Sequence, residues 1–212
     1  MVFAFSDAAL AALDRKPRRV CLEFANTMAW HASENPQERL LSYGDLVGWG
    51  EGAGLLSRHE ARELRKEALA RPAEAARALE RAIELRETVY RVFVAMIGGV
   101  SPAGSDLSGL NEALGGPLRG AGIGESAGGF SWTWKVEADA LDRLMWPLAW
   151  SAARLLASLE KARVGQCADD RGCGWLFLDT SRNGSRRWCD INDCGNRAKQ
   201  RRHYARIRTR AR

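Results

Sequence analysis

The sequence predicts a mainly α-helical protein that ends in a small zinc-binding unit. Three observations support this: segments with apolar residues at helical spacing up to about residue 162, four cysteines in two close pairs near the C-terminus, and a concentration of basic residues around them. Apolar residues make up 46% of the 212 residues and charged residues 27%, as in ordinary globular proteins. We therefore expect a helical part over residues 1–162 and a separate unit over 163–212.

Five helices are predicted in the first part, over residues 38–56, 57–70, 72–98, 105–114 and 138–162. Ser57 and Glu60 form a capping box at the start of the second helix, and Pro72 suits the first turn of the third. Pro147 is expected to kink the last helix, because proline in a helix interior removes a backbone hydrogen bond.

Two other segments in this part have different patterns. Residues 130–136 alternate between apolar and polar side chains, which predicts a strand, and we expect this strand to pair with residues 117–123 in a small hairpin. Residues 20–26 fit a strand or the start of a helix, and periodicity does not decide between them.

The excess of positive charge lies entirely in the last quarter of the chain. Residues 161–212 contain 14 Lys and Arg against 5 Asp and Glu, whereas the whole chain has 32 against 26. The net charge is therefore +9 for this segment and −3 for the remainder. Such an asymmetry predicts a polyanionic partner for the basic segment.

Four of the five cysteines lie in the same segment, at positions Cys167, Cys173, Cys189 and Cys194. Two close pairs joined by fifteen residues are typical of zinc ribbons and treble-clef fingers, although the first gap, of five residues, is wider than usual. Four thiolates complete a tetrahedral zinc and leave no position for water or substrate. We therefore predict one structural Zn²⁺, with four reduced thiols and no metal as the alternative.

The segment between the two cysteine pairs predicts a hairpin. Residues 175–179 and 186–189 are expected to form its strands. Asn183-Gly184 favours a tight turn between them, because both residues tolerate positive φ angles.

Residues 194–212 predict a basic helix, which Asn192 or Asp193 would cap. We call the turn that carries Cys167 and Cys173 the knuckle. Together, the knuckle, the hairpin and the helix predict a treble-clef-like finger, with the last cysteine in the first turn of the helix. The basic residues of the helix form two stripes, one of Lys199, Arg202, Arg206 and Arg210 and the other of Arg197, Arg201, Arg208 and Arg212. Between them, Tyr204, Ile207 and Ala211 form an apolar strip that can pack on the hairpin.

These features predict nucleic-acid binding. Both stripes suit contacts to phosphates, and the hairpin turn adds Arg182, Asn183, Arg186 and Arg187. Arginine and asparagine can read guanine and adenine in a major groove, so we predict base contacts from Arg182, Asn183 and Arg186 and phosphate contacts from the helix. The alternatives are a solubilising tail and RNA binding by the same finger.

The residues Cys194-Gly195-Asn196-Arg197 spell the signature of the CGNR zinc fingers, and residues 177–183 and 186–189 resemble the hairpin of that family. Residues 21–27, 43–49 and 147–156 are similar to the ABATE domain, which usually precedes this finger. The resemblance covers about residues 163–208 for the finger and 15–160 for the ABATE domain. It implies zinc on the four clustered cysteines, DNA binding by the finger, and a role among proteins regarded as bacterial, stress-linked transcription regulators.

A regulator needs an input, and one candidate site lies early in the chain. Polar groups occur among apolar ones at Glu23, Asn26, Thr27, Trp30 and His31, which we interpret as a small-molecule site; packing of an ordinary turn is the alternative. The three histidines form no recognisable metal or nucleophile pattern, so we expect no enzymatic activity.

The sequence also gives expectations about location and assembly. No stretch approaches the roughly 18 apolar residues of a membrane-spanning helix. Residues 1–7 lack the basic leader of a signal peptide, so we expect a cytoplasmic protein without a membrane partner. A homodimer is one arrangement that the sequence leaves open.

Overall fold

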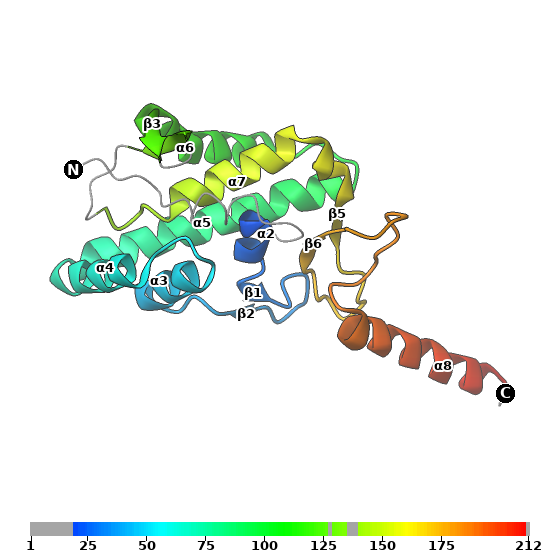
Figure 1. Cartoon of the computed structure of the whole chain (residues 1–212). Helices are drawn as coiled ribbons and strands as arrows, with labels where there is room; N and C mark the ends of the chain where they lie inside the picture. The colour runs from blue at the N-terminus through cyan, green and yellow to red at the C-terminus, as the bar shows by residue number, and fades with distance from the viewer. Residues whose placement is uncertain (1–18, 127–128, 135–139, 211–212) are drawn as a thin grey trace.

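The computed structural model of the chain describes residues 19–126, 129–134 and 140–210. Within these ranges the predicted mainly helical fold is confirmed, with three two-stranded antiparallel sheets added to the helices. Figure 1 shows the long helix α5 (Pro72–Ile97) crossing the molecule, with α7 (Met145–Ala157) and α6 (Gly104–Gly120) beside it. Helices α3 (Tyr43–Gly52) and α4 (Arg58–Ala70) lie towards one end, and the cysteine-rich segment lies at the other.

The short helix α2 (Val20–Ala25) lies in the middle of the core and contacts both α5 and α7. Five of its six residues are buried, and Cys21 and Phe24 have no exposed surface. Only Glu23 is partly exposed, so these six residues show no regular alternation of polar and apolar positions, which explains why periodicity left this segment undecided. Burial raises the pKa of the Cys21 thiol to about 11, so this lone cysteine stays protonated at neutral pH.

Two of the predicted helices begin and end where expected. Before α4, the side chains of Ser57 and Glu60 accept from each other's backbone N–H groups at 3.2 and 2.7 Å, which confirms the capping box. Helix α5 has Pro72 in its first turn and ends before Gly98. Helix α6 is longer than the short helix predicted over residues 105–114.

The prediction of a helix over residues 38–56 is wrong at its start. Strand β2 (Gln37–Glu38) pairs with β1 (Met28–Ala29), and Ser42 then caps α3 by accepting a hydrogen bond from the Asp45 N–H at 3.2 Å. The carboxylate of Glu38 fixes this strand pair to the core, because it binds the fully buried Arg86 of α5 at 2.6 and 2.7 Å.

The last helix of the first part is shorter than predicted. Helix α7 begins at Met145, and a 3-10 turn over Leu159–Arg163 follows it. Pro147 therefore lies in the first turn, where a missing N–H breaks no helical hydrogen bond and no kink is needed. Residues 135–139, part of the predicted strand and helix, lie outside the described ranges.

The predicted small hairpin exists, with a shifted pairing. Strand β3 (Ala121–Ser126) pairs antiparallel with β4 (Gly129–Trp134), so that Ala121 lies opposite Trp134. Residues 117–120, expected in the first strand, instead complete helix α6.

The cysteine-rich segment joins the same core as the helices. Strand β5 (Val164–Gln166) pairs antiparallel with β6 (Leu176–Leu178), and the side chains of Val164, Leu176 and Leu178 are buried in the helical core. The Asn26 side chain accepts from the Leu176 N–H at 2.8 Å and donates to the Leu176 carbonyl at 2.9 Å. The division at residue 163 stays a prediction, because this core crosses it.

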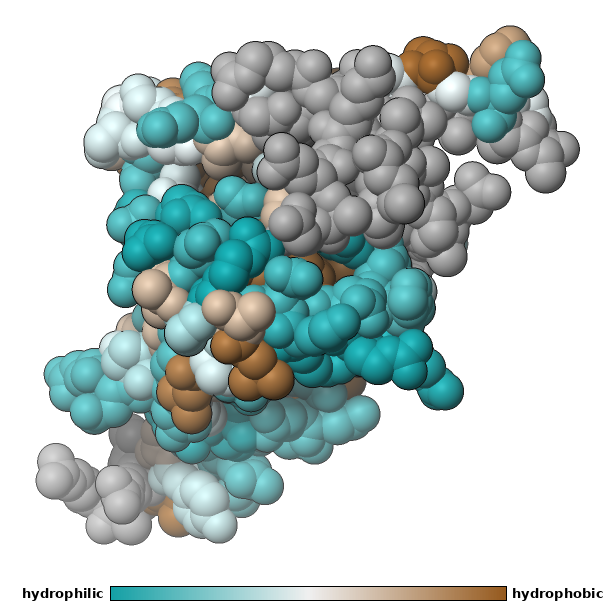
Figure 2. Space-filling view, turned by 90° about the vertical axis from the view of Figure 1, so that its left-hand side faces the viewer, coloured by the Kyte–Doolittle hydropathy of each residue, from teal (hydrophilic) through white to brown (hydrophobic). Residues whose placement is uncertain are grey.

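None of the helices in the described ranges is both long and apolar enough to cross a membrane. Where Figure 2 shows described residues, the face turned away from the cysteine-rich segment is largely hydrophilic, with hydrophobic side chains gathered below its middle.

Candidate metal centre and nucleic-acid interface

The four clustered cysteines converge on one point. Cys167 follows β5, Cys173 lies before β6, Cys189 belongs to the loop after β6, and Cys194 lies in a π-helical turn over Ile191–Gly195. Their Sγ atoms all lie within 4.8 Å of one another; Cys189 is 3.7 Å from Cys173 and 3.5 Å from Cys194. Sulfurs about 2.3 Å from a tetrahedral zinc are about 3.8 Å apart. The donor set and its spacing therefore fit one structural Zn²⁺.

The electrostatics of the thiols point to the same cation. Hydrogen bonds from Cys173 and Cys189 lower the pKa of Cys167 below its usual range. The hydrogen bond to Cys167 raises the pKa of Cys189, and burial raises the pKa of Cys194. Thiols this close together cannot all ionise unless a cation compensates their charge, and zinc binding requires the deprotonated form.

The strand that partners β6 is not the one predicted. The pairing of β5 with β6 continues into the knuckle, where the Cys167 N–H donates to the Trp175 carbonyl at 2.9 Å. Residues 186–189 form no strand. Asp179 instead turns the chain into a loop, since its carboxylate accepts from the Ser181 and Arg186 N–H groups at 2.7 and 2.9 Å.

The turn that carries Cys194 is capped two positions before Asn192, the first of the two predicted caps. The Asp190 carboxylate accepts from the Asn192 N–H at 2.7 Å, so neither Asn192 nor Asp193 is the cap. Because the π-helical turn begins at Ile191, Cys194 lies within the first turn, as predicted, and α8 (Asn196–Arg210) continues from it.

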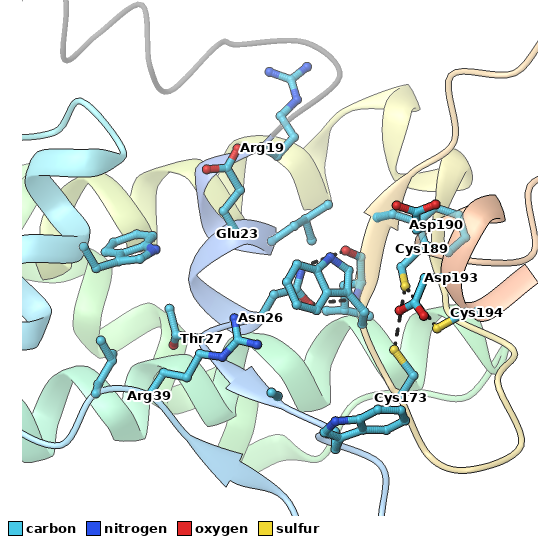
Figure 3. Close-up of a pocket in the computed structure, with 18 of the residues that line it drawn as sticks. Arg19, Glu23, Asn26, Thr27, Arg39, Cys173, Cys189, Asp190, Asp193 and Cys194 are labelled. Carbon is cyan, nitrogen blue, oxygen red and sulfur yellow. Dashed lines mark hydrogen bonds between the residues drawn. The ribbon is translucent and has the colours of Figure 1, made fainter. Parts of the chain in front are cut away.

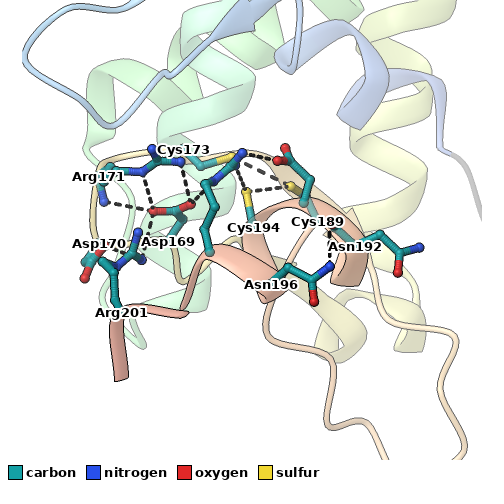
Figure 4. A network of polar contacts seen from close by, with 11 residues as sticks. Asp169, Asp170, Arg171, Cys173, Cys189, Asn192, Cys194, Asn196 and Arg201 are labelled. Atoms are coloured by element: carbon teal, nitrogen blue, oxygen red, sulfur yellow. Dashed lines mark hydrogen bonds and ion pairs between the residues drawn. The ribbon is translucent and has the colours of Figure 1, made fainter. Parts of the chain in front are cut away.

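A buried carboxylate, Asp169, organises the start of α8 (Figure 4). Its fully buried side chain forms ion pairs with Arg171 at 3.4 Å, Arg197 at 3.3 Å and Arg201 at 3.3 Å. Burial alone would raise the pKa of Asp169, but hydrogen bonds from Arg171 and Arg197 hold this pKa well below its usual range. Asp169 therefore stays charged and ties the knuckle to the helix.

Arg197 connects this carboxylate to the metal centre. Its Nη2 donates to Cys194 Sγ at 2.9 Å, and its guanidinium also pairs with Asp193. The indole ring of Trp30 lies beneath it, with the ring centroid 5.5 Å from Arg197 Cζ and 5.1 Å from Arg171 Cζ. Trp30 has a φ of 55°, a conformation that bulky residues rarely adopt, so its surroundings must impose it.

Two knuckle glycines allow close contact with the helical part. The Ala32 N–H donates to the Gly172 carbonyl at 3.1 Å. A Cβ at Gly172 would lie 2.5 Å from the Ser33 Cα, and one at Gly174 would lie 2.6 Å from the Tyr90 hydroxyl. Both glycines also have positive φ angles, of 85° and 66°. Larger residues at either position would push the knuckle away from residues 32–33 and α5.

The structure divides the basic residues predicted to contact nucleic acid into two groups. Arg197 and Arg201 are bound by Asp169, and Arg186 donates to the carbonyls of Trp188 and Cys189. The second group is exposed to solvent and forms no ion pair within the described ranges. It consists of Arg182, Arg187, Lys199, Arg202 and Arg206, and the uncharged Asn183 is exposed beside them. The side chain of Arg210 is outside the described part.

Helix α8 projects from the body of the molecule (Figure 1). Its side chains at Tyr204 and Ile207 are 64% and 49% exposed, so the prediction that they pack on a hairpin is wrong. The physical reason is that the expected second strand does not form, so the two side chains have no hairpin face to pack on. The loop in its place approaches the helix at Trp188, whose ring centroid lies 6.0 Å from Arg202 Cζ. Ala211 lies outside the described residues.

Four of the five residues predicted to bind a small molecule line one open groove of about 1070 Å³ (Figure 3). Glu23, Asn26, Thr27 and Trp30 form part of its wall, and the cysteine-rich segment contributes Trp175, Phe177 and the edges of Cys173, Cys189 and Cys194. His31 does not line this groove. Its ring stacks on Tyr90, with centroids 3.5 Å apart, and its Nε2 lies 2.8 Å from the Glu87 carboxylate.

Two of these residues also have structural roles. Asn26 binds the backbone of β6, and the Thr27 hydroxyl donates to the Phe24 carbonyl at 2.7 Å. Sequence reasoning missed Arg39, which lines the same groove, and Asp169. The signal for Asp169 was an acidic residue between the first two cysteines of a strongly basic segment; Arg39 had no comparable signal.

We predict that Arg197→Gln weakens zinc binding by about 10–100-fold, because the substitution removes the N–H···S bond that supports a ligand. Competition with a chromophoric chelator measures the change. Arg206→Gln, an exposed arginine on the same helix, is the matched control and should bind zinc like the wild type. Equal zinc affinity in both variants would show that Arg197 does not support the metal centre.

Comparisons with known families agree with this architecture. The profile of the ABATE family, described as "Putative stress-induced transcription regulator", matches residues 18–159. The CGNR zinc finger profile matches residues 163–207 and so includes all four clustered cysteines. A search of curated proteins found no match. The first profile covers more than half of the chain, so the chain belongs to the ABATE family, and its C-terminal segment is a CGNR zinc finger.

Proposed function

We propose that the protein is a transcription regulator that binds duplex DNA through its zinc finger. The observation that carries this proposal is the set of exposed cations on α8. Lys199, Arg202 and Arg206 have no acidic partner in the described part of the chain, while a buried carboxylate fixes the start of the same helix. Cations held on a rigid support suit a polyphosphate backbone.

RNA binding is the second candidate. Single-stranded RNA is recognised largely by stacking of bases on exposed aromatic rings. Tyr204 is exposed, but Trp188 is half-buried and lies against Arg187, with 5.4 Å between the guanidinium carbon and the ring centroid. Among the Phe, Tyr and Trp rings of the finger's described residues, only Tyr204 is largely exposed, so little surface is available for base stacking, which favours the duplex.

We predict that replacing Lys199, Arg202 and Arg206 together by glutamine makes DNA binding less dependent on salt. Each lost phosphate contact should reduce the slope of log affinity against log salt by about 0.9, and so by about 2.7 in total. Fluorescence anisotropy on a random duplex, across a salt series, measures the slope.

The control variant for this measurement replaces Arg58, Arg62 and Lys66, which are exposed on α4, by glutamine. It removes the same charge from the helical part and should keep the wild-type slope. A full-length protein that prefers single-stranded RNA to duplex DNA, or two variants with equal slopes, would contradict the proposal.

We further propose that the groove between the helical part and the finger binds a small-molecule effector. Its lining comes from α2, α3 and β6 and from the metal-binding cysteines, so an occupant would touch both parts of the chain. The wall carries Trp30, Trp49 and Trp175, and the Arg39 guanidinium forms no ion pair with a described residue. The acidic Asp190 and Asp193 lie at the opposite end of the groove from Arg39 (Figure 3). Aromatic walls and the Arg39 guanidinium at its own end suit an anion with an apolar body.

Anilinonaphthalene sulfonate, an aromatic anion, is a suitable probe for this groove. We predict that it binds the folded protein with a rise in fluorescence, and that Arg39→Gln weakens binding by about tenfold, since a charge-assisted hydrogen bond contributes about 1.5–3 kcal/mol. Arg62→Gln on α4 is the control. An equal titration curve for both variants would exclude Arg39 as the anion contact.

The remaining expectations stay predictions. These are the absence of enzymatic activity, a cytoplasmic location and the homodimer.

A further inference from the structure

Helix α8 presents an apolar strip that nothing in the described part of the chain covers. The strip consists of Tyr204 and Ile207, which lie about 60° apart around the helix axis. Because the two side chains lie next to each other on a projecting helix, they are available for contact with a partner.

The charges around the strip identify its partner. Helix α8 contains seven Lys and Arg and no Asp or Glu among its 15 residues. At 100° per residue, Lys199 and Arg206 lie about 80–100° from Ile207 on one side, and Arg201 lies about 60° from Tyr204 on the other. A second copy of the helix would bring these cations together, whereas a polyanion would neutralise them.

The geometry points to the major groove of duplex DNA, and we propose that α8 lies along it as the recognition helix. Tyr204 and Ile207 would contact base edges, and Lys199 and Arg206 would contact phosphates. A helix about 10–12 Å in diameter fits a major groove about 12 Å wide. The apolar group that a base edge offers there is the thymine methyl, so the target contains thymine opposite the strip. This inference rests on the proposed DNA binding.

The anchoring of the helix supports this role. Arg197 and Arg201 bind the buried Asp169 beside the metal centre, so that α8 leaves the finger at a fixed angle. The loop after β6 is a weaker candidate for base contacts, because Arg186 is already bound to the carbonyls of Trp188 and Cys189. Arg182 and Asn183 are exposed in that loop and are assigned to phosphate contacts.

The test begins with selection of preferred duplexes from a random library by the full-length, zinc-loaded protein. Affinities are then measured for the selected duplex, a scrambled duplex, and the selected duplex with deoxyuridine in place of thymidine, which removes only the methyl groups. Two variants are compared: Tyr204→Ala with Ile207→Ala, and Arg182→Gln with Asn183→Ala. Alanine favours helix, and zinc content together with circular dichroism verifies that both variants are folded.

We expect the helix variant to lose about tenfold or more in affinity for the selected duplex and to bind the scrambled one as the wild type does. Removing the thymine methyls should weaken the wild type and leave the helix variant unaffected. The loop variant should bind both duplexes more weakly by the same factor. A loop variant that loses sequence preference while the helix variant keeps it would overturn the inference.

Other outcomes separate this inference from the proposed function. A wild-type protein that binds all duplexes equally, with a steep salt dependence, would overturn base reading by α8 and leave DNA binding intact. A protein that binds no duplex would overturn both. A wild-type dimer that the helix variant converts to a monomer, by analytical ultracentrifugation, would assign the strip to self-association and overturn the inference.

Discussion

Four sulfur atoms within 4.8 Å of one another are the constraint on which the C-terminal quarter of the molecule depends. They come from the residue after β5, the segment before β6, the loop after β6 and the turn before α8, so one cation fixes all four segments. The arginine of the CGNR signature, Arg197, extends this constraint outward by binding Cys194 Sγ, the buried Asp169 and the face of Trp30. The direction of α8 therefore follows from the metal centre rather than from packing of the helix on the body.

The finger is also built into the helical part rather than attached to it by a linker. Asn26 forms two hydrogen bonds with the backbone of β6, Tyr90 accepts from Gln166 at 2.8 Å, and Leu176 and Leu178 belong to the helical core. The groove lies along this junction, with walls from both parts. An effector in the groove would therefore act on the finger through direct contact, without a conformational signal carried across the helices.

Local signals in the sequence predicted local structure well. The capping box at Ser57, the long helix after Pro72 and the cysteine set depend on nearby residues, and the structure contains all three. The partner of β6 could not be predicted, because β5 has only three residues and precedes the first cysteine. Helical periodicity placed Arg197 and Arg201 together on a basic stripe. It could not show that both arginines bind Asp169, because Asp169 lies outside the helix, 28 residues before Arg197.

The central claim, that a single zinc holds the finger together, is tested most directly by hydrogen–deuterium exchange of the full-length protein with its zinc content known. We predict one zinc per chain. After removal of zinc by a chelator, amide exchange should accelerate across residues 164–195 and α8, while the amides of α5 keep their protection. A protein without zinc, or one in which residues 164–195 exchange at the same rate before and after chelation, would contradict the account.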